Sequence, residues 1–180
     1  MTIQELIKRA SAQSNAPADQ STDEALMLIV GECSRALEAH KAKLRAKKED
    51  VHILWIGDMA VNISDPGWAR VYQKRLINSV EDHLSNVAIL IADLCGRWDY
   101  LLDERDLMME DGFDVARSLL GVVVNVTSRN RDIGSTPSVA ALSHGMNLCF
   151  GIARGMNIDL WKHIELKFAY SEALSKQWKA

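Results

Sequence analysis

The segment from Leu76 to Trp98, LINSVEDHLSNVAILIADLCGRW, places the strongest constraint on how this chain can fold. Apolar residues recur in it at intervals of three and four, as one buried face of a helix requires: Leu76, Val80, Leu84, Val87, Ile91, Leu94 and Cys95. Further apolar residues lie around the helix, so we predict an interior helix with neighbours in most directions. Polar residues gather near its start: Glu81, Asp82, His83, Ser85 and Asn86.

Size and charge exclude several classes of protein. At 180 residues the chain is long enough for one sizeable core, and we expect a single domain over residues 1–180. The net charge of −3 argues against a nucleic-acid partner, because neutralising phosphates requires a basic excess. No apolar run could span a bilayer, and the first residues lack a basic segment followed by an apolar block. We therefore expect no membrane association and a cytoplasmic protein. The three cysteines, Cys33, Cys95 and Cys149, are expected to be buried free thiols.

Capping signals divide the chain into helices. Thr2 with Glu5 and Ser21 with Glu24 are capping boxes. Asp65 before Pro66 predicts another helix start. Before the central helix we predict a helix to about 14, a helix from 22 to about 48, and a helix from 66 that either joins the central helix or breaks near Asn78. After it we predict a short helix over 99–112, a helix from 115 capped by Asp114, and a loop over 128–138. The last two predicted helices cover 139–154 and 159–177, the second capped by Asp159.

Two segments leave the assignment open. Residues 51–59 fit either a helix or irregular structure, and residues 121–127 are rich enough in β-branched side chains to fit a strand. The recurring order of helix, stop and cap nevertheless favours an all-α helical bundle.

Two polar clusters could meet inside such a bundle. One contains Glu32, Arg35 and Glu38, and the other is the polar start of the central helix. Spacings of three and four place each cluster on one helical face. From the residues alone, the favoured interpretation of the first cluster is an ordinary solvated helix face with ion pairs. His83 alone fits a partly buried, hydrogen-bonded histidine, and a transition-metal site built from Glu32, Asp82 and His83 is a further alternative.

Three segments, LMLIVGECSRALEAHK, VEDHLSNVAILIADLCGR and NIDLWKHIELKFAY, resemble the MazG-like, all-α nucleoside triphosphate pyrophosphohydrolase family. The resemblance covers about residues 22–49, 70–98 and 155–171. It implies a MazG-like helical bundle with an inserted helical segment, about 99–154, before the last helix. It also implies a homo-oligomer, a dimer or a tetramer.

In that family, a Glu-x-x-Glu and a Glu-x-x-Asp motif supply four carboxylates that hold magnesium against the triphosphate. The corresponding positions here are Glu32, Arg35, His83 and Asn86, so only Glu32 keeps its carboxylate. Arg35 places a permanent cation where an anionic ligand is needed, and His83 offers nitrogen, a poor match for magnesium. The resemblance therefore implies a metal site in which three of four ligand positions are replaced, with Glu81 and Asp82 as the available rescue ligands.

The family's nucleotide-holding segment near the C-terminus matches only in part. Lys167 and Tyr170 correspond to its Lys and Tyr, and they are the nucleotide-binding residues that the resemblance implies. Ser171, Leu174 and Ser175 stand where the family has Asn, Arg and Pro.

The resemblance and the substitutions together lead to one expectation and two alternatives. We expect a MazG-like fold that is catalytically impaired or inactive, a pseudoenzyme acting in nucleotide binding or assembly, and we assign it no catalytic residue and no cofactor. The first alternative is an active enzyme that cleaves a nucleoside triphosphate to the monophosphate and diphosphate, with Mg²⁺ held by a rearranged carboxylate set. The acids available for that set are Glu32, Glu38, Glu81, Asp82 and Asp93. The second is a protein-interaction module.

Overall fold

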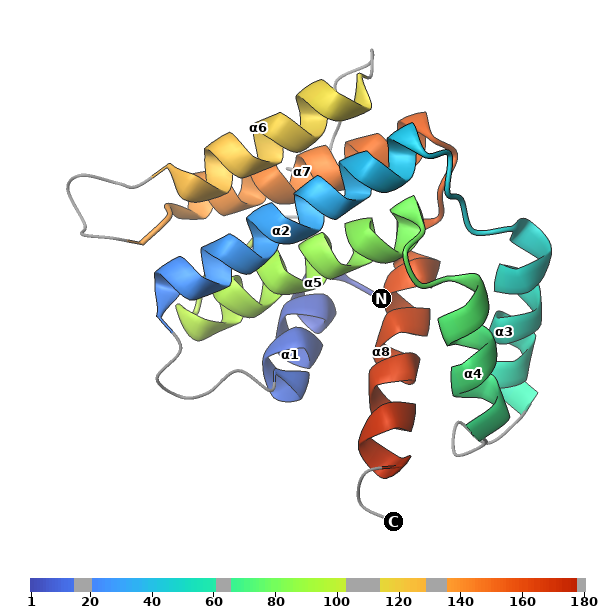
Figure 1. The fold of residues 1–180 in the computed structure, drawn as a ribbon. Helices are drawn as coiled ribbons and strands as arrows, with labels where there is room; N and C mark the ends of the chain where they lie inside the picture. The colour runs from blue at the N-terminus through green and yellow to red at the C-terminus, as the bar shows by residue number, and fades with distance from the viewer. Residues whose placement is uncertain (15–20, 61–65, 103–113, 129–135, 178–180) are drawn as a thin grey trace.

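The computed structural model describes residues 1–14, 21–60, 66–102, 114–128 and 136–177, and of residues 56–60, 66 and 177 the backbone alone. All regular elements in this part of the chain are helices, which confirms the predicted all-α class (Figure 1). They are α1 (Ile3–Gln13), α2 (Thr22–Lys41), α3 (Lys48–Ala60), α4 (Pro66–Arg75), α5 (Val80–Arg97), α6 (Val115–Thr127), α7 (Val139–Gly155) and α8 (Leu160–Gln177).

Side-chain caps begin α1, α2 and α6 where the sequence predicts them, and the predicted cap Asp65 lies outside the described residues. The Thr2 hydroxyl accepts from the Glu5 amide at 3.2 Å, and the Glu5 carboxylate accepts from the Thr2 amide at 2.7 Å. Ser21 and Glu24 repeat this capping box at the start of α2. Asp114 accepts from the backbone of α6 at 3.1 Å, which confirms it as the N-cap. These local hydrogen bonds fix the helix starts because the first amide groups of a helix have no partner within the helix.

The prediction was wrong about where α2 ends, and the structure decides between the two alternatives that the sequence left open for the start of α5. The helix predicted to run to about Lys48 ends at Lys41, because Lys43 has a φ of 56° and the Leu44 amide turns back to the Ala39 carbonyl at 2.9 Å. Asn78, with a φ of 68°, separates α4 from α5, so the break near Asn78 is confirmed over a continuous helix.

Both segments of open assignment are helical. Residues 51–59 lie within α3, and residues 121–127 lie within α6, so the strand alternative is wrong. The β-branched residues of α6 are tolerated because Val122 and Val126 are buried against the core. The helix predicted over 99–112 and the loop over 128–138 fall largely outside the described residues.

The core surrounds α5, which packs against α1, α2, α7 and α8 as an interior helix should. One buried cluster joins these helices with α6, so the two helices from the region after residue 99 share the main core. Packing of α1 on α5 is close at Gly96, where an added Cβ would lie 1.8 Å from the Ser11 hydroxyl oxygen. The three cysteines are buried free thiols, as predicted.

A second, smaller cluster joins α3 and α4 to α8. Its largest members include Leu54, Trp68, Tyr72 and Tyr170. The rings of Tyr72 and Tyr170 stack with their centroids 4.4 Å apart, and the Trp68 indole donates to the Leu54 carbonyl at 3.2 Å. Helix α8 therefore belongs to both clusters and links them.

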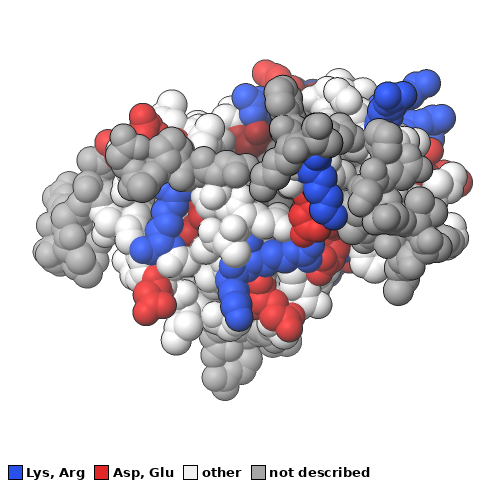
Figure 2. Space-filling view, turned by 90° about the horizontal axis from the view of Figure 1, so that it is seen from below, with Lys and Arg blue, Asp and Glu red and all other residues white. Residues whose placement is uncertain are grey.

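Charges of both signs are interspersed on the surface. On the face seen in Figure 2, basic side chains lie beside acidic ones. None of the described helices has the length and hydropathy needed to cross a bilayer.

Candidate functional site

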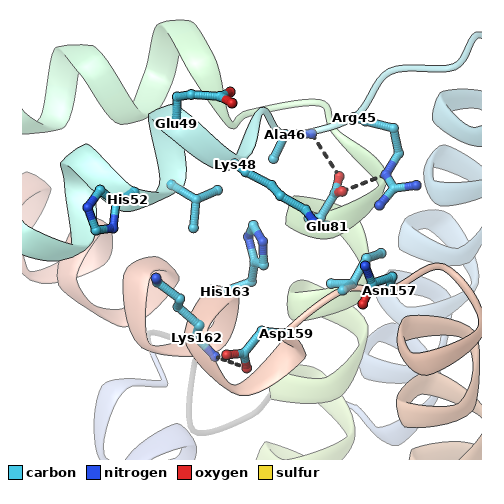
Figure 3. Close-up of a pocket in the computed structure, with 12 residues that line it drawn as sticks. Arg45, Ala46, Lys48, Glu49, His52, Glu81, Asn157, Asp159, Lys162 and His163 are labelled. Atoms are coloured by element: carbon cyan, nitrogen blue, oxygen red, sulfur yellow. Dashed lines mark hydrogen bonds and ion pairs between the residues drawn. The ribbon is translucent and has the colours of Figure 1, made fainter.

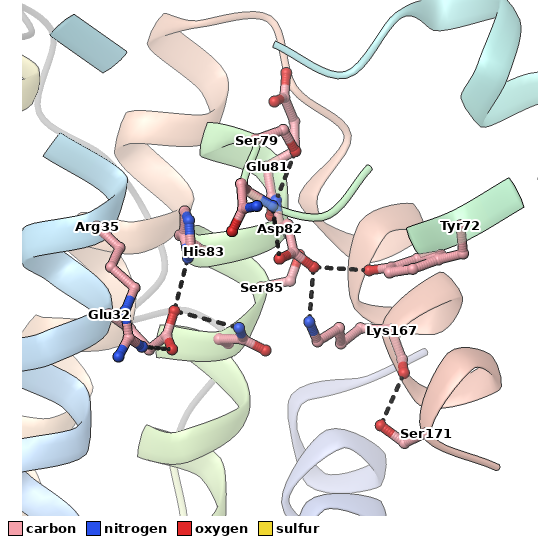
Figure 4. Close-up of polar contacts among 12 residues, drawn as sticks. Glu32, Arg35, Tyr72, Ser79, Glu81, Asp82, His83, Ser85, Lys167 and Ser171 are labelled. Carbon is pink, nitrogen blue, oxygen red and sulfur yellow. Dashed lines mark hydrogen bonds and ion pairs between the residues drawn. The ribbon is translucent and has the colours of Figure 1, made fainter. Parts of the chain in front are cut away.

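Three consecutive side chains at the start of α5 turn toward three different neighbours (Figure 4). Glu81, Asp82 and His83 are each at most 6% exposed. Successive residues on a helix are separated by about 100°, so adjacent side chains cannot share one partner easily. Each of them must find its own hydrogen bonds, because an unpaired buried polar group destabilises the fold.

His83 turns toward α2 and joins Glu32. The His83 Nδ1 lies 2.8 Å from Glu32 Oε2, and the Asn86 amide donates to the same oxygen at 3.2 Å. Arg35, one turn along α2, donates to Glu32 Oε1 at 2.5 Å. The four positions that the sequence singled out therefore lie together in one contact network, which we call the Glu32 cluster: Glu32, Arg35, His83 and Asn86.

The Glu32 cluster is electrically balanced by its own members. Burial alone would raise the pKa of the Glu32 carboxyl, but hydrogen bonds from His83 and Asn86 and the charges of His83 and Arg35 outweigh burial and lower it. The carboxylate is thus ionised at neutral pH, and the Arg35 guanidinium supplies the opposite charge. No spare negative charge is left at these four positions.

Asp82 turns instead toward α4 and α8. Its Oδ1 accepts from the Lys167 ammonium at 2.7 Å and from the Tyr72 hydroxyl at 2.9 Å. Burial and then the Asp82 charge raise the pKa of Tyr72. Lys167 also lies 5.9 Å from the ring centroid of Tyr170. The two residues predicted to bind nucleotide are therefore close together, but Lys167 already forms an ion pair within the protein.

Glu81 turns toward the connection between α2 and α3. Its two oxygens accept from the Arg45 Nε at 2.6 Å and from the Ala46 amide at 3.0 Å. Arg45 also donates to the Met156 carbonyl at 3.1 Å, at the end of α7. Arg45 was not predicted as a site residue, because nothing in the local sequence distinguishes it from the lysines around it.

The remaining candidate acids do not gather at the Glu32 cluster. Asp93 pairs with Arg97 one turn further along α5, at 2.6 Å, and Glu38 is exposed on α2. Among the residues that the structure describes, no three His, Cys, Asp or Glu side chains are arranged to hold a metal ion. The proposed rescue ligands pair elsewhere, Glu81 with Arg45 and Asp82 with Lys167, so neither joins the Glu32 cluster.

A cleft of about 720 Å³ opens beside Glu81 (Figure 3). Its walls come from the starts of α3, α5 and α8 and from the turn between α7 and α8. Basic and imidazole side chains line it, namely Arg45, Lys48, His52, Lys162 and His163. Burial lowers the pKa of His163, and the charges of Glu81, Asp159 and Asp82 offset this only in part. The sequence did not indicate this cleft, because its lining residues come from three separate parts of the chain.

Comparisons of the chain with protein-family models, with curated proteins and with solved structures give no match.

Proposed function

We propose that this chain is a MazG-like helical protein that has exchanged metal-dependent hydrolysis for a nucleotide-binding or assembly role. The observation that carries the proposal is the contact network of the Glu32 cluster. Four side chains stand at the positions where the family holds its metal ligands, and they contact one another on facing helices. Their arrangement supports the resemblance, and their chemistry argues against catalysis.

A magnesium ion needs hard oxygen ligands with enough negative charge to balance its own. In the Glu32 cluster one carboxylate faces one guanidinium, and the other two members are an imidazole and an amide. Arg35 repels a divalent cation, while both oxygens of Glu32 already accept hydrogen bonds. The cluster is therefore suited to holding α2 against α5 and unsuited to holding a metal beside a triphosphate.

The rearranged, active enzyme is less favoured by the same contacts. Glu81 and Asp82 would have to leave Arg45 and Lys167 before either could bind a metal. Removing one partner from a buried ion pair costs about 3 to 5 kcal/mol, which metal binding would have to exceed.

A diphosphate-release assay with the common nucleoside triphosphates tests the proposal, run with Mg²⁺ and again with Mn²⁺. The wild-type chain is expected to show no release above background. Two variants distinguish turnover by the Glu32 cluster from contaminating activity. Glu32→Ala changes the cluster, and Glu38→Ala makes the same change on the exposed side of the same helix. Turnover that is retained in Glu38→Ala and abolished in Glu32→Ala would overturn the proposal in favour of the active enzyme.

Exposed apolar side chains on α6 favour assembly as a second candidate function. Leu120 is 62% exposed and Val124 is 53% exposed, and a spacing of four places them on one face. If this face joins copies of the chain, light scattering will give a dimer or tetramer mass for the wild type and a monomer mass for Leu120→Glu/Val124→Glu. A comparable change elsewhere, Val71→Glu on α4, should leave the mass unchanged. A monomeric wild type contradicts this candidate.

A further inference from the structure

We propose that the cleft between the starts of α3, α5 and α8 binds the phosphate groups of a nucleotide-sized ligand without a divalent metal. This inference deepens the nucleotide-binding part of the proposed function and rests on it. It gives that role a site that is separate from the Glu32 cluster. The cleft retains basic side chains that form no ion pair with a carboxylate in the described residues.

The acids that line the cleft are largely engaged by the protein itself. Glu81 has a side chain only 3% exposed, and both of its oxygens are used by Arg45 and the Ala46 amide. Asp159 accepts from the Lys162 amide at 3.1 Å and so caps the start of α8. The Glu49 side chain lies at the rim and extends away from His163 (Figure 3). The charge of Glu81 is therefore balanced by Arg45, and that of Asp159 is directed at the first amide groups of α8.

The two lysines of the cleft lack such engagement. Lys48 comes from the α3 wall and Lys162 from the α8 wall, so they approach the space from two sides (Figure 3). Within the described part of the chain, neither ammonium group forms an ion pair with a carboxylate, and the Lys162 ammonium lies 5.1 Å from the centre of the Trp55 ring. An anion between these lysines would meet two cations, neither of which has to leave a carboxylate in the described residues.

Helix direction adds to the same preference. Helices α3, α5 and α8 have 13, 18 and 18 residues, and the first turn of each contributes to the lining. The N-terminal end of a helix carries a partial positive charge, roughly half an elementary charge. Three such ends border this space, and the one at the start of α8 is already capped by Asp159.

The cleft also has room for more than a phosphate. Its volume of about 720 Å³ falls in the range of small-molecule sites, roughly 300 to 1,000 Å³. Val51 and Ile158 give part of the wall an apolar character, and the His52 imidazole lies beside it. A ring system could pack there while its phosphates lie between the lysines, so we assign the site to a nucleoside phosphate or a phosphorylated metabolite of similar size.

Calorimetric titration with adenosine triphosphate, diphosphate and adenosine, all with a metal chelator present, tests this assignment. The double variant Lys48→Gln/Lys162→Gln should bind the first two probes about tenfold more weakly or worse, because charged hydrogen bonds of this kind are lost. The matched control Lys8→Gln/Lys74→Gln removes the same charge from exposed positions on α1 and α4 and should bind like the wild type. Equal melting temperatures for the variants confirm that each remains folded.

The outcomes separate this inference from the proposed function. Binding of the phosphate probes that weakens in the cleft variant alone supports the site. Wild-type binding that is unchanged in the cleft variant overturns the site and leaves nucleotide binding elsewhere intact. Silence with every probe overturns the site and removes the nucleotide-binding part of the proposed function, while the absence of hydrolysis remains a separate result. Adenosine that binds as tightly as the triphosphate also overturns the site, since phosphates would then contribute nothing.

Discussion

The Glu32 cluster and the cleft lie on different sides of the first turn of α5, and they are built in opposite ways. In the cluster, each charge has a partner from the protein: Glu32 is held by Arg35 and His83. In the cleft, Lys48 and Lys162 face open space without a carboxylate partner in the described residues. A network whose charges are satisfied stabilises the fold, whereas unsatisfied cations around a space can bind a ligand. Resemblance to a catalytic motif and the capacity to bind a ligand can therefore reside in different parts of one molecule.

The largest loss of stability is expected from removing the carboxylate of Asp82, which accepts hydrogen bonds from Lys167 and Tyr72. Asp82→Ala leaves the Lys167 ammonium and the Tyr72 hydroxyl without their acceptor. We expect it to lower the free energy of unfolding by about 3 kcal/mol or more. Chemical denaturation measures this, with the exposed cap variant Asp114→Ala as a control that should cost about 1 kcal/mol. An Asp82 variant no less stable than the control would show that the pairing is not what holds α4 and α8 to α5.

Glu32→Gln should have the next largest effect and tests whether the cluster is structural. It removes the charge that His83, Asn86 and Arg35 all contact, and we expect a loss of about 1 to 2 kcal/mol. Glu38→Gln, an exposed change on the same helix, should stay within about 0.5 kcal/mol of the wild type. Equal midpoints for the two variants would mean that the cluster contributes no net stability.

A smaller effect on stability is expected from pH, because it involves a single proton on His163 of the cleft. The pKa of His163 is lowered in the folded state because of burial, so the unfolded chain binds this proton more readily. Neutral His163 therefore contributes fully to the free energy of unfolding above pH 6.5, the ordinary pKa of histidine. This contribution is lost as the pH falls below that value toward the lowered pKa of the folded state. His163→Gln should flatten the dependence of stability on pH in that range, whereas His144→Gln at an exposed position should not. Parallel pH profiles for the two variants would contradict the assignment.

Arg35→Gln should have the smallest effect on stability. The Arg35 side chain is 59% exposed, and exposed ion pairs of this kind contribute about 0.5 kcal/mol or less. The free energy of unfolding, measured by chemical denaturation, should therefore stay within that margin of the wild-type value. A loss comparable to that of Glu32→Gln would indicate that the guanidinium stabilises the fold, in addition to opposing a metal ion.

Features that depend on near neighbours in the sequence were predictable. The caps at Thr2, Ser21 and Asp114 follow from hydrogen bonds three residues apart, and the burial of α5 follows from its apolar spacing. The grouping of Glu32 with His83 was also anticipated, although only a resemblance indicated which faces would meet. These predictions succeeded because the periodicity of a helix determines which side chains share a face.

Features that depend on distant segments were not predictable. Arg45 pairs with Glu81, 36 residues away, and reaches Met156, 111 residues away. The early end of α2 at Lys41 depends on a single left-handed residue, Lys43, in a run of residues that all favour helix. Arg45 and Ala46, which line the cleft, lie in the connection that follows this early end, so neither the position nor the lining of the cleft could be predicted from the local pattern.

The most direct test of the central claim is a calorimetric titration of Mg²⁺ into the wild type and into Arg35→Glu/His83→Glu/Asn86→Asp, which restores four acidic side chains to the Glu32 cluster. The control Arg117→Glu/His144→Glu/Gln73→Glu makes the same change in charge at exposed positions on three other helices. We predict saturable binding by the restored cluster alone, and no binding by the wild type or the control. Stoichiometric Mg²⁺ binding by the wild type, lost in Glu32→Ala, would contradict the claim that this cluster has been neutralised.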